Sequence, residues 1–160
     1  SRTGVGARRG GRSSERSPYH KGVATPITLR PVGRVESPLK EPAGAPKQAD
    51  EGAPEAVLVI EPEFAAGLTG LEPGDDVLVL TWLDRADRDI VVNHPRSDRS
   101  RPVAGVFTTR SPHRPNPIGL HQVTVVGVNG GRVCVRSLEA VDGTPILDIK
   151  GLLHPDISQR

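Results

Sequence analysis

Valine-rich runs of strand length, bounded by Gly, Pro or Asp, constrain the fold of this chain more than any other feature. The runs are AVLVI at 56–60, DVLVLTWL at 76–83, AGVFTT at 104–109, LHQVTVVGV at 120–128, RVCVRSL at 132–138 and PILDI at 145–149. Short runs rich in β-branched residues between turn-forming residues are typical of strands. The sequence VNGGR predicts a tight hairpin between two of them. Only EPEFAAGLTGL at 61–71 indicates a helix, and it is brief.

The order of these elements decides between fold classes. They do not alternate as repeated strand–helix–strand units, so a doubly wound parallel sheet is not expected. Several short strands at this spacing instead predict an all-β fold, a small closed or nearly closed β-barrel with one short helix. A single such domain over residues 26–160 suits the length of the chain, which is 160 residues.

Residues 1–25 differ from the rest of the chain in composition. They are rich in Gly, Arg and Ser, and six Arg and Lys residues stand against the single acidic residue Glu15. Low hydrophobicity and a strong net charge are typical of disordered segments. We therefore expect a disordered basic tail, which is either a flexible extension or an arm that contacts nucleic acid.

The one cysteine, Cys134, excludes an internal disulfide and gives no sign of an oxidising compartment. It lies in the alternating stretch GRVCVRS and is expected in the core. The chain contains no apolar stretch of about 18 residues, the length needed to cross a membrane. A cytoplasmic protein without membrane contact is therefore expected.

Several familiar catalytic signatures are missing from the sequence. It contains no GxGxxG with a strand–helix context, no phosphate-binding loop of the Walker type and no nucleophile elbow. The five histidines do not have metal-ligand spacing, and one cysteine does not complete a usual zinc site. We therefore expect no metal.

The stretch TTRSPHRPNPIGLH at 108–121 interrupts the strand pattern with three prolines. Each proline fixes its own φ and keeps the preceding residue out of the helical region, so Ser111, Arg114 and Asn116 should be extended. The guanidinium groups of Arg110 and Arg114 can hold a carboxylate or phosphate with two hydrogen bonds, and Asn116 can both donate and accept. The segment is either an ordinary ordered loop with solvated arginines or a preorganised cradle for an anionic or polar ligand.

Two further stretches carry clustered charges. SLEAVDGTPILDIK at 137–150 brings Glu139, Asp142 and Asp148 together around a DG turn, as a charged hairpin end or as the wall of a pocket. Residues 85–114 contain seven arginines against three aspartates. This basic stripe, which includes Arg96 and Arg99, is either a solvated surface or a phosphate-contacting one.

Taken in order along the chain, these motifs resemble a known family. TRSPHRPNPIG followed by LEAVDGTPILDIK, with RPVGRVESPLKEP and PKQADEGAPEAVLVI before them, is similar to the TrmO family of S-adenosylmethionine-dependent tRNA methyltransferases. The resemblance covers about Leu29 to Leu153. It implies a β-barrel unlike the Rossmann methyltransferases, a homodimer, and methylation of N6 of threonylcarbamoyl-adenosine beside the anticodon of threonine tRNAs.

The resemblance also implies which residues bind the methyl donor. Transferred by position, the donor-binding set is Gln48, Ala49, Asp50, Asp84, Arg85, Arg110, Leu120, Glu139, Ala140, Val141 and Asp142. Asp84 and Arg85 stand where some relatives have His-Gln. An arginine fork suits the donor's carboxylate, and Glu139 or Asp142 suits its ribose hydroxyls or ammonium.

Residues for the acceptor and for proton transfer follow from residue chemistry alone. Arg96, Arg99, Arg114 and Asn116 are the predicted substrate-binding residues. The general base stays open among Asp142, His113 and His121, because the histidines titrate near neutral pH and Asp142 lies in the implied pocket. Two other functions remain: the same donor with a small-molecule or different RNA acceptor, and a non-catalytic barrel that binds a ligand or RNA.

Overall fold

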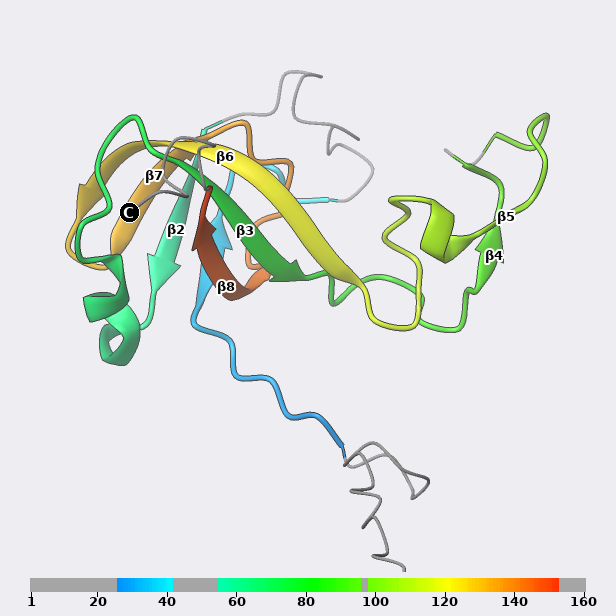
Figure 1. Ribbon diagram of the computed structural model, residues 1–160, viewed down its shortest axis with the longest axis horizontal. Coiled ribbons are helices and arrows are strands. Elements are labelled where there is room, and N and C mark those ends of the chain that lie inside the picture. Colours follow the sequence, from blue (N-terminus) through cyan, green and yellow to red (C-terminus); the bar gives the residue numbers. More distant parts are fainter. Residues whose placement is uncertain (1–25, 42–54, 96–97, 153–160) are drawn as a thin grey trace, which may run out of the picture.

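The computed structural model describes residues 26–41, 55–95 and 98–152. Six strands close into a barrel in the order β1, β2, β7, β6, β3, β8, with every neighbouring pair antiparallel. Figure 1 shows these strands wrapping around one another. Their bounds are β1 Gly33–Glu36, β2 Ala56–Ile60, β3 Asp76–Trp82, β6 Ile118–Asn129, β7 Arg132–Arg136 and β8 Pro145–Gly151. The predominantly β fold expected from the valine-rich runs is confirmed.

The core of the barrel follows from the two-residue period of its strands. In β2 and β3 every second residue is buried, as expected when alternate side chains face the interior. The fully buried side chains that fill the barrel are Val35, Leu58, Val79, Val123, Val125, Val133, Val135, Leu138 and Ile146. Branched side chains of similar size therefore stabilise the barrel by burial of apolar surface.

The same alternation corrects the expectation for Cys134. Val133 and Val135 are both fully buried, so the residue between them faces outward, and Cys134 is only half-buried. In the stretch GRVCVRS, burial of the two valines leaves no inward position for the cysteine.

The helix and the hairpin expected from the sequence are both present. The helical segment is a short 3₁₀ helix, η3, at Pro62–Leu68, from which Phe64 and Leu68 pack against the core. The hairpin between β6 and β7 pairs Asn129 with Arg132, and Gly130 adopts a φ of 60° in its turn. A glycine takes this left-handed conformation without the cost that a side chain imposes.

Residues 83–117 leave the barrel between β3 and β6 and are called the arm here; Figure 1 shows the arm projecting away from the strands. The arm contains a two-stranded sheet of β4 (Val92–Asn93) and β5 (Ala104–Gly105), followed by a 3₁₀ turn, η5 (Val106–Thr108).

The strand expected over 104–109 is therefore wrong beyond Gly105. The Thr108 hydroxyl donates to the Gly105 carbonyl over 2.8 Å, and the Thr109 hydroxyl donates to the Val106 carbonyl over 3.3 Å. Such local side-chain hydrogen bonds compete with a β ladder for the same carbonyls. The threonines therefore favour a turn where their β propensity alone indicates a strand.

The antiparallel order gives the barrel two different ends. Three connections share one end, which we call the loop end: 37–55 between β1 and β2, 83–117 between β3 and β6, and 137–144 between β7 and β8. The opposite end, called the turn end, holds the connections 61–75 and 130–131. Among the described residues, those predicted to bind the methyl donor belong to the arm, to the 137–144 connection or to the start of β6.

Candidate functional site

The centre of the loop end is Asp142, which joins the 137–144 connection to the segment after β1. Its Oδ1 accepts a hydrogen bond from the Ser37 backbone N–H over 2.9 Å, and its Oδ2 lies 2.8 Å from Lys40 Nζ. The Asp142 N–H donates in turn to the Leu39 carbonyl over 2.7 Å. Lys40 and then the Ser37 N–H lower the pKa of Asp142 below its ordinary value, since both stabilise the ionised carboxylate.

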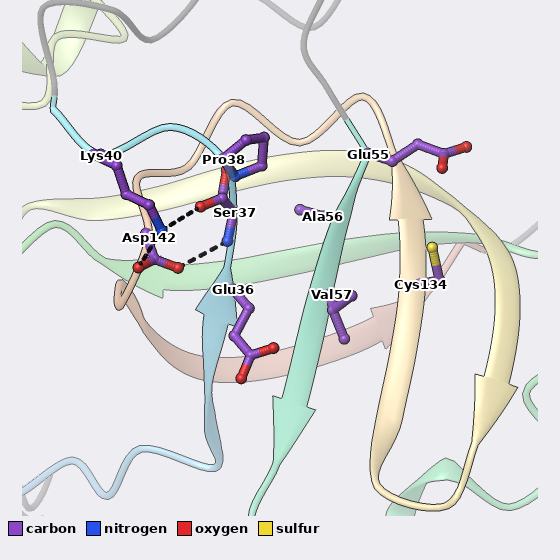
Figure 2. Close-up of a pocket in the computed structure, with 9 residues that line it drawn as sticks. All are labelled: Glu36, Ser37, Pro38, Lys40, Glu55, Ala56, Val57, Cys134 and Asp142. Atoms are coloured by element: carbon purple, nitrogen blue, oxygen red, sulfur yellow. Dashed lines mark hydrogen bonds and ion pairs between the residues drawn. The ribbon is translucent and has the colours of Figure 1, made fainter.

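A groove of about 610 Å³ opens beside this contact. Figure 2 shows its lining residues, several of which lie on β1, β2 and β7, with Lys40 Nζ between the Ser37 carbonyl and the Asp142 carboxylate. Its lining residues are Glu36, Ser37, Pro38, Lys40, Glu55, Ala56, Val57, Cys134 and Asp142. Among the described residues, the groove shares Asp142 alone with the predicted donor-binding set.

Arg85, at the start of the arm, reaches the same segment after β1. Its Nη1 donates to the Lys40 carbonyl over 3.2 Å and lies 3.6 Å from a carboxylate oxygen of Glu41. Asp84 and Arg85 are both exposed. The structure therefore brings Arg85 and Asp142 to one region through Lys40, although these residues come from different connections.

Arg110 and Leu120, two other predicted donor-binding residues, are in contact. Arg110 Nη2 donates to the Leu120 carbonyl over 3.3 Å. Leu120 and its neighbour Ile118 expose 43% and 44% of their surface. An exposed guanidinium beside exposed aliphatic side chains can hold an anionic group next to an apolar one.

Glu139 connects the 137–144 connection to the interior of the barrel. Its Oε1 lies 3.0 Å from Nδ1 of His121 on β6, and His121 Nε2 lies 2.8 Å from Oγ1 of Thr81 on β3. Thr81 and His121 are buried, with 0% and 5% of their surface exposed. Of the neighbours of Glu139 in the donor-binding set, Ala140 is buried and Val141 is half-buried.

The proline-rich stretch is held together by its own arginines. Arg114 donates through Nε to the Ser111 carbonyl over 2.7 Å, and through Nη2 to the carbonyls of Val106 and Thr109 over 2.9 and 2.6 Å. Arg114 therefore organises the backbone of the arm instead of projecting into solvent. In this way guanidinium donors satisfy backbone carbonyls of the arm that have no partner in a β-sheet.

A second arginine of the basic stripe has a similar role. Arg88 donates through Nε to the Pro115 carbonyl over 2.9 Å, and its guanidinium carbon lies 5.2 Å from the centre of the Trp82 ring. This arrangement is a cation–π contact that ties the arm to the end of β3. Part of the basic stripe thus stabilises the arm.

The remaining predicted residues lie on the arm or outside the described part of the chain. His113 is exposed, and its Nδ1 accepts a hydrogen bond from the Asp87 N–H over 3.0 Å. Arg99 and Asn116 are exposed as well. Gln48, Ala49, Asp50 and Arg96 lie outside the described residues.

Two general features complete the description of the site. Within 26–41, 55–95 and 98–152, no three His, Cys, Asp or Glu side chains are grouped closely enough to hold a metal ion. In the same ranges no helix has the length and apolar character required to cross a bilayer.

The sequence and the fold agree with one family. Residues 34–155 match the family described as the N-terminal domain of tRNA-methyltransferase O. This chain belongs to the tRNA-methyltransferase O (TrmO) family. The resemblance inferred from the proline-rich and DGTP motifs is therefore confirmed.

Relatives of known name or structure support this membership. An S-adenosyl-L-methionine-binding protein of Archaeoglobus fulgidus is 44% identical over 125 residues, which is 78% of this chain and 88% of that protein. A probable S-adenosyl-L-methionine-binding protein of the same organism is also 44% identical over 125 residues, but this chain spans only 33% of its length. A crystal structure of TrmO from Pseudomonas aeruginosa has a TM-score of 0.65 and 31% identity, and the match covers 81% of this chain and 57% of that chain.

The structure adds two residues that sequence reasoning missed. Lys40 links Asp142 to Arg85 at the loop end, and Thr81 completes the hydrogen-bonded series with His121 and Glu139. Lys40 had a weak signal, since it lies in the family-like stretch RPVGRVESPLKEP. Thr81 had none, because a threonine in a valine-rich strand is ordinary.

Proposed function

We propose that this protein is an S-adenosylmethionine-dependent methyltransferase that acts on tRNA, with the methyl donor bound at the loop end of the barrel. The observation that carries the proposal is that Arg110, Leu120, Glu139 and Asp142, to which the motif resemblance gives donor-binding roles, all lie at this end. The finer proposal is that the acceptor is N6 of threonylcarbamoyl-adenosine beside the anticodon, and that the product is S-adenosylhomocysteine.

The chemistry of the loop end fits this donor. Glu139 Oε2 is a buried acceptor that has no hydrogen-bond partner among the described residues, so a hydroxyl or ammonium hydrogen of a ligand would satisfy it. Arg110 presents a guanidinium suited to a carboxylate, and Asp142 presents a carboxylate whose pKa Lys40 and the Ser37 N–H lower. A donor with an amino acid, a ribose and a cationic sulfur can use each of these groups.

The role of the protein in the reaction is mainly to hold and align. The bound donor supplies an electrophilic methyl group, and methyl transfer is an in-line displacement. Arg110, Glu139 and the backbone near Leu120 would fix the donor's orientation, and the arm beside them would fix the acceptor. Alignment of this kind supplies much of the rate enhancement of a displacement between two bound reactants.

The three candidates for the general base differ in their surroundings. Asp142 is a weakened base, because Lys40 and the Ser37 N–H lower its pKa. His121 is buried, with both ring nitrogens in hydrogen bonds. His113 is exposed on the arm and has one nitrogen engaged by the Asp87 N–H. Because Nδ1 of the neutral His113 ring accepts that hydrogen, Nε2 carries a hydrogen of its own and is not free to take a proton, so the general base stays open among the three.

The arm also supports a tRNA acceptor and a homodimer. Arg99 and Arg110 are exposed basic residues on the arm, and such residues suit phosphate contacts. Apolar side chains are exposed on the same segment, with Phe107 at 87% and Val91, Val92 and Val103 each at 56%. Apolar exposure of this kind suits burial against a second copy of the chain. A tRNA acceptor would place the protein in the cytoplasm.

Calorimetric titration with S-adenosylhomocysteine tests the donor, and methylation of bulk tRNA with a radiolabelled donor tests the acceptor. We expect saturable binding of about one S-adenosylhomocysteine per chain. We also expect the label to enter tRNA, and the affinity of the protein for tRNA to fall as the salt concentration rises. Binding without transfer to tRNA would favour a different acceptor or a non-catalytic barrel. Absence of donor binding, both with and without tRNA, would contradict the proposal.

A further inference from the structure

Three polar side chains form a hydrogen-bonded series that begins in the interior of the barrel. Thr81 on β3, His121 on β6 and Glu139 after β7 are linked by contacts of 2.8 and 3.0 Å. The residues of the surrounding core are Val, Leu, Ile and Ala. Buried polar groups in such surroundings destabilise the fold unless they are hydrogen-bonded, so this series requires its partners in fixed positions.

The chemistry of the partners assigns the hydrogens. An ionised carboxylate only accepts hydrogen bonds, so His121 Nδ1 carries the hydrogen that faces Glu139. In the neutral ring, Nε2 is then an acceptor, and the Thr81 hydroxyl donates to it. Each side chain thereby fixes the orientation of the next, from the wall of the barrel to the loop end.

The series ends in an acceptor without a partner. His121 engages Glu139 through Oε1, whereas Oε2 is buried and has no hydrogen-bond partner among the described residues. An acceptor in this state is costly and gains most from a ligand that supplies a hydrogen. The fixed Glu139 carboxylate is therefore positioned to accept a hydrogen bond from a ligand.

Gly119 makes room for the series. It pairs with Thr81 across β3 and β6, and its own position faces the interior. A Cβ atom at Gly119 would collide with Thr81 Oγ1 and would lie 2.6 Å from His121 Nε2. The close approach of the threonine and the histidine thus depends on the absence of a side chain at this position.

We propose that His121 is a positioning residue of the donor site, which holds the Glu139 carboxylate through Nδ1 so that Oε2 accepts a hydroxyl or ammonium hydrogen of the methyl donor. The proposal rests on the proposed function, because it takes the donor to bind beside Glu139. It gives His121 a role through Glu139 and no part in proton transfer to or from the acceptor.

Two substitutions separate the contacts of His121. His121→Asn places an amide nitrogen where Nδ1 lies and keeps the donor to Glu139, while the contact with Thr81 is lost. His121→Gln places its amide where Nε2 lies and keeps the contact with Thr81, while Glu139 loses its donor. Both variants remove one buried hydrogen bond, so we expect similar falls in melting temperature.

Calorimetric titration with S-adenosylhomocysteine provides the test. We expect the affinity of His121→Asn to stay within about threefold of the wild type, and that of His121→Gln to fall about tenfold or more. Equal affinities in the two variants would overturn the positioning role alone. Absence of binding to the wild-type protein would overturn this role and the proposed function together.

A measurement on the wild-type protein does not depend on the variants folding. Nitrogen-15 NMR of the histidine rings should show His121 protonated at Nδ1, and its Nδ1–H resonance should move when S-adenosylhomocysteine binds, because the ligand then shares the Glu139 carboxylate. A resonance that does not change on saturation with the ligand would overturn the proposal.

Discussion

The two ends of the barrel use the same six strands but are closed by different interactions. At the turn end, backbone groups pair with one another: the Ile60 N–H donates to Gly131, and the Gly74 N–H donates to Val125, each over 2.8 Å. At the loop end, backbone pairs such as Asp142 N–H with the Leu39 carbonyl are joined by side-chain contacts, as when Lys40 binds Asp142 and Arg110 binds the Leu120 carbonyl.

This difference gives the two ends different roles, with the turn end contributing to stability and the loop end to ligand binding. At the turn end, backbone pairs and a 3₁₀ helix packed against the core hold the barrel closed. Exposed side-chain contacts at the loop end contribute little stability each, and they can exchange partners when a ligand arrives. We therefore expect substitutions at the turn end to change unfolding, and those at the loop end to change binding.

The largest effect is expected from Gly33→Ala, at the start of β1. A Cβ atom there would collide with the Val59 carbonyl oxygen, so β1 would have to separate from β2. We expect the free energy of unfolding to fall by about 3 kcal/mol, measured by urea denaturation. Gly67→Ala is the matched control, because its Cβ would meet nothing within 4 Å. Equal midpoints for the two variants would contradict this account of the turn end.

Arg110→Ala should have the next largest effect, which is a loss of donor affinity without a loss of stability. Loss of a charge-assisted hydrogen bond should weaken S-adenosylhomocysteine binding by about 1.5–3 kcal/mol in calorimetry. The melting temperature should hardly change, because the Arg110 side chain is exposed. Arg30→Ala, which removes an exposed partner of Glu63 on η3, is the control and should leave donor affinity unchanged. An unaltered affinity for Arg110→Ala would remove Arg110 from the site.

The pH dependence of the stability of Asp142→Asn tests the ion pair between Asp142 and Lys40 at the loop end. Asparagine still accepts from the Ser37 N–H but loses the charge that faces Lys40. Because the pKa of Asp142 is lowered in the folded protein, its stabilising contribution is complete above about pH 4 and is lost as the pH falls through the lowered value. The variant should therefore melt below the wild type at neutral pH, and the gap should close in acid. A gap that is constant with pH would exclude this ion pair as its cause.

The smallest effect should come from the basic stripe. Arg96→Ala combined with Arg99→Ala should weaken tRNA binding modestly and lower the slope of affinity against salt by about one for each lost phosphate contact. Filter binding at several salt concentrations measures the slope, and calorimetry should show unchanged donor affinity. A parallel loss of donor affinity would mean that these arginines support the arm itself, as Arg88 and Arg114 do.

Local sequence patterns predicted which segments form strands better than they predicted which strands lie next to each other. The valine alternation and the VNGGR turn are local signals, and they gave β2, β3, β6, β7 and the hairpin. The closing strand β1 has only four residues, GRVE, and carries no such signal. Its place between β2 and β8 depends on pairing with residues far along the chain, such as Gly33 with Ile146.

The candidate site was predictable only as a set of sequence positions. The motifs placed Arg110, Glu139 and Asp142 in donor-binding roles, but they did not show that Arg114 is used on backbone carbonyls. They also did not show that His121 faces inward. That orientation follows from the register of β6. The proline-rich residues before β6 make the start of the strand, and so its register, hard to predict from the sequence.

The pairing of β1 with β8 has a consequence for the way this chain is made. The first strand of the barrel finds its second partner only after the last strand has been synthesised, because Gly33 and Arg34 pair with Ile146 and Pro145. Until then β1 and β3, the two partners of β8, each have an open edge, which is a site for pairing with other chains. Folding governed by such distant contacts is slow. The nascent chain is therefore most vulnerable to aggregation just before its final strand leaves the ribosome.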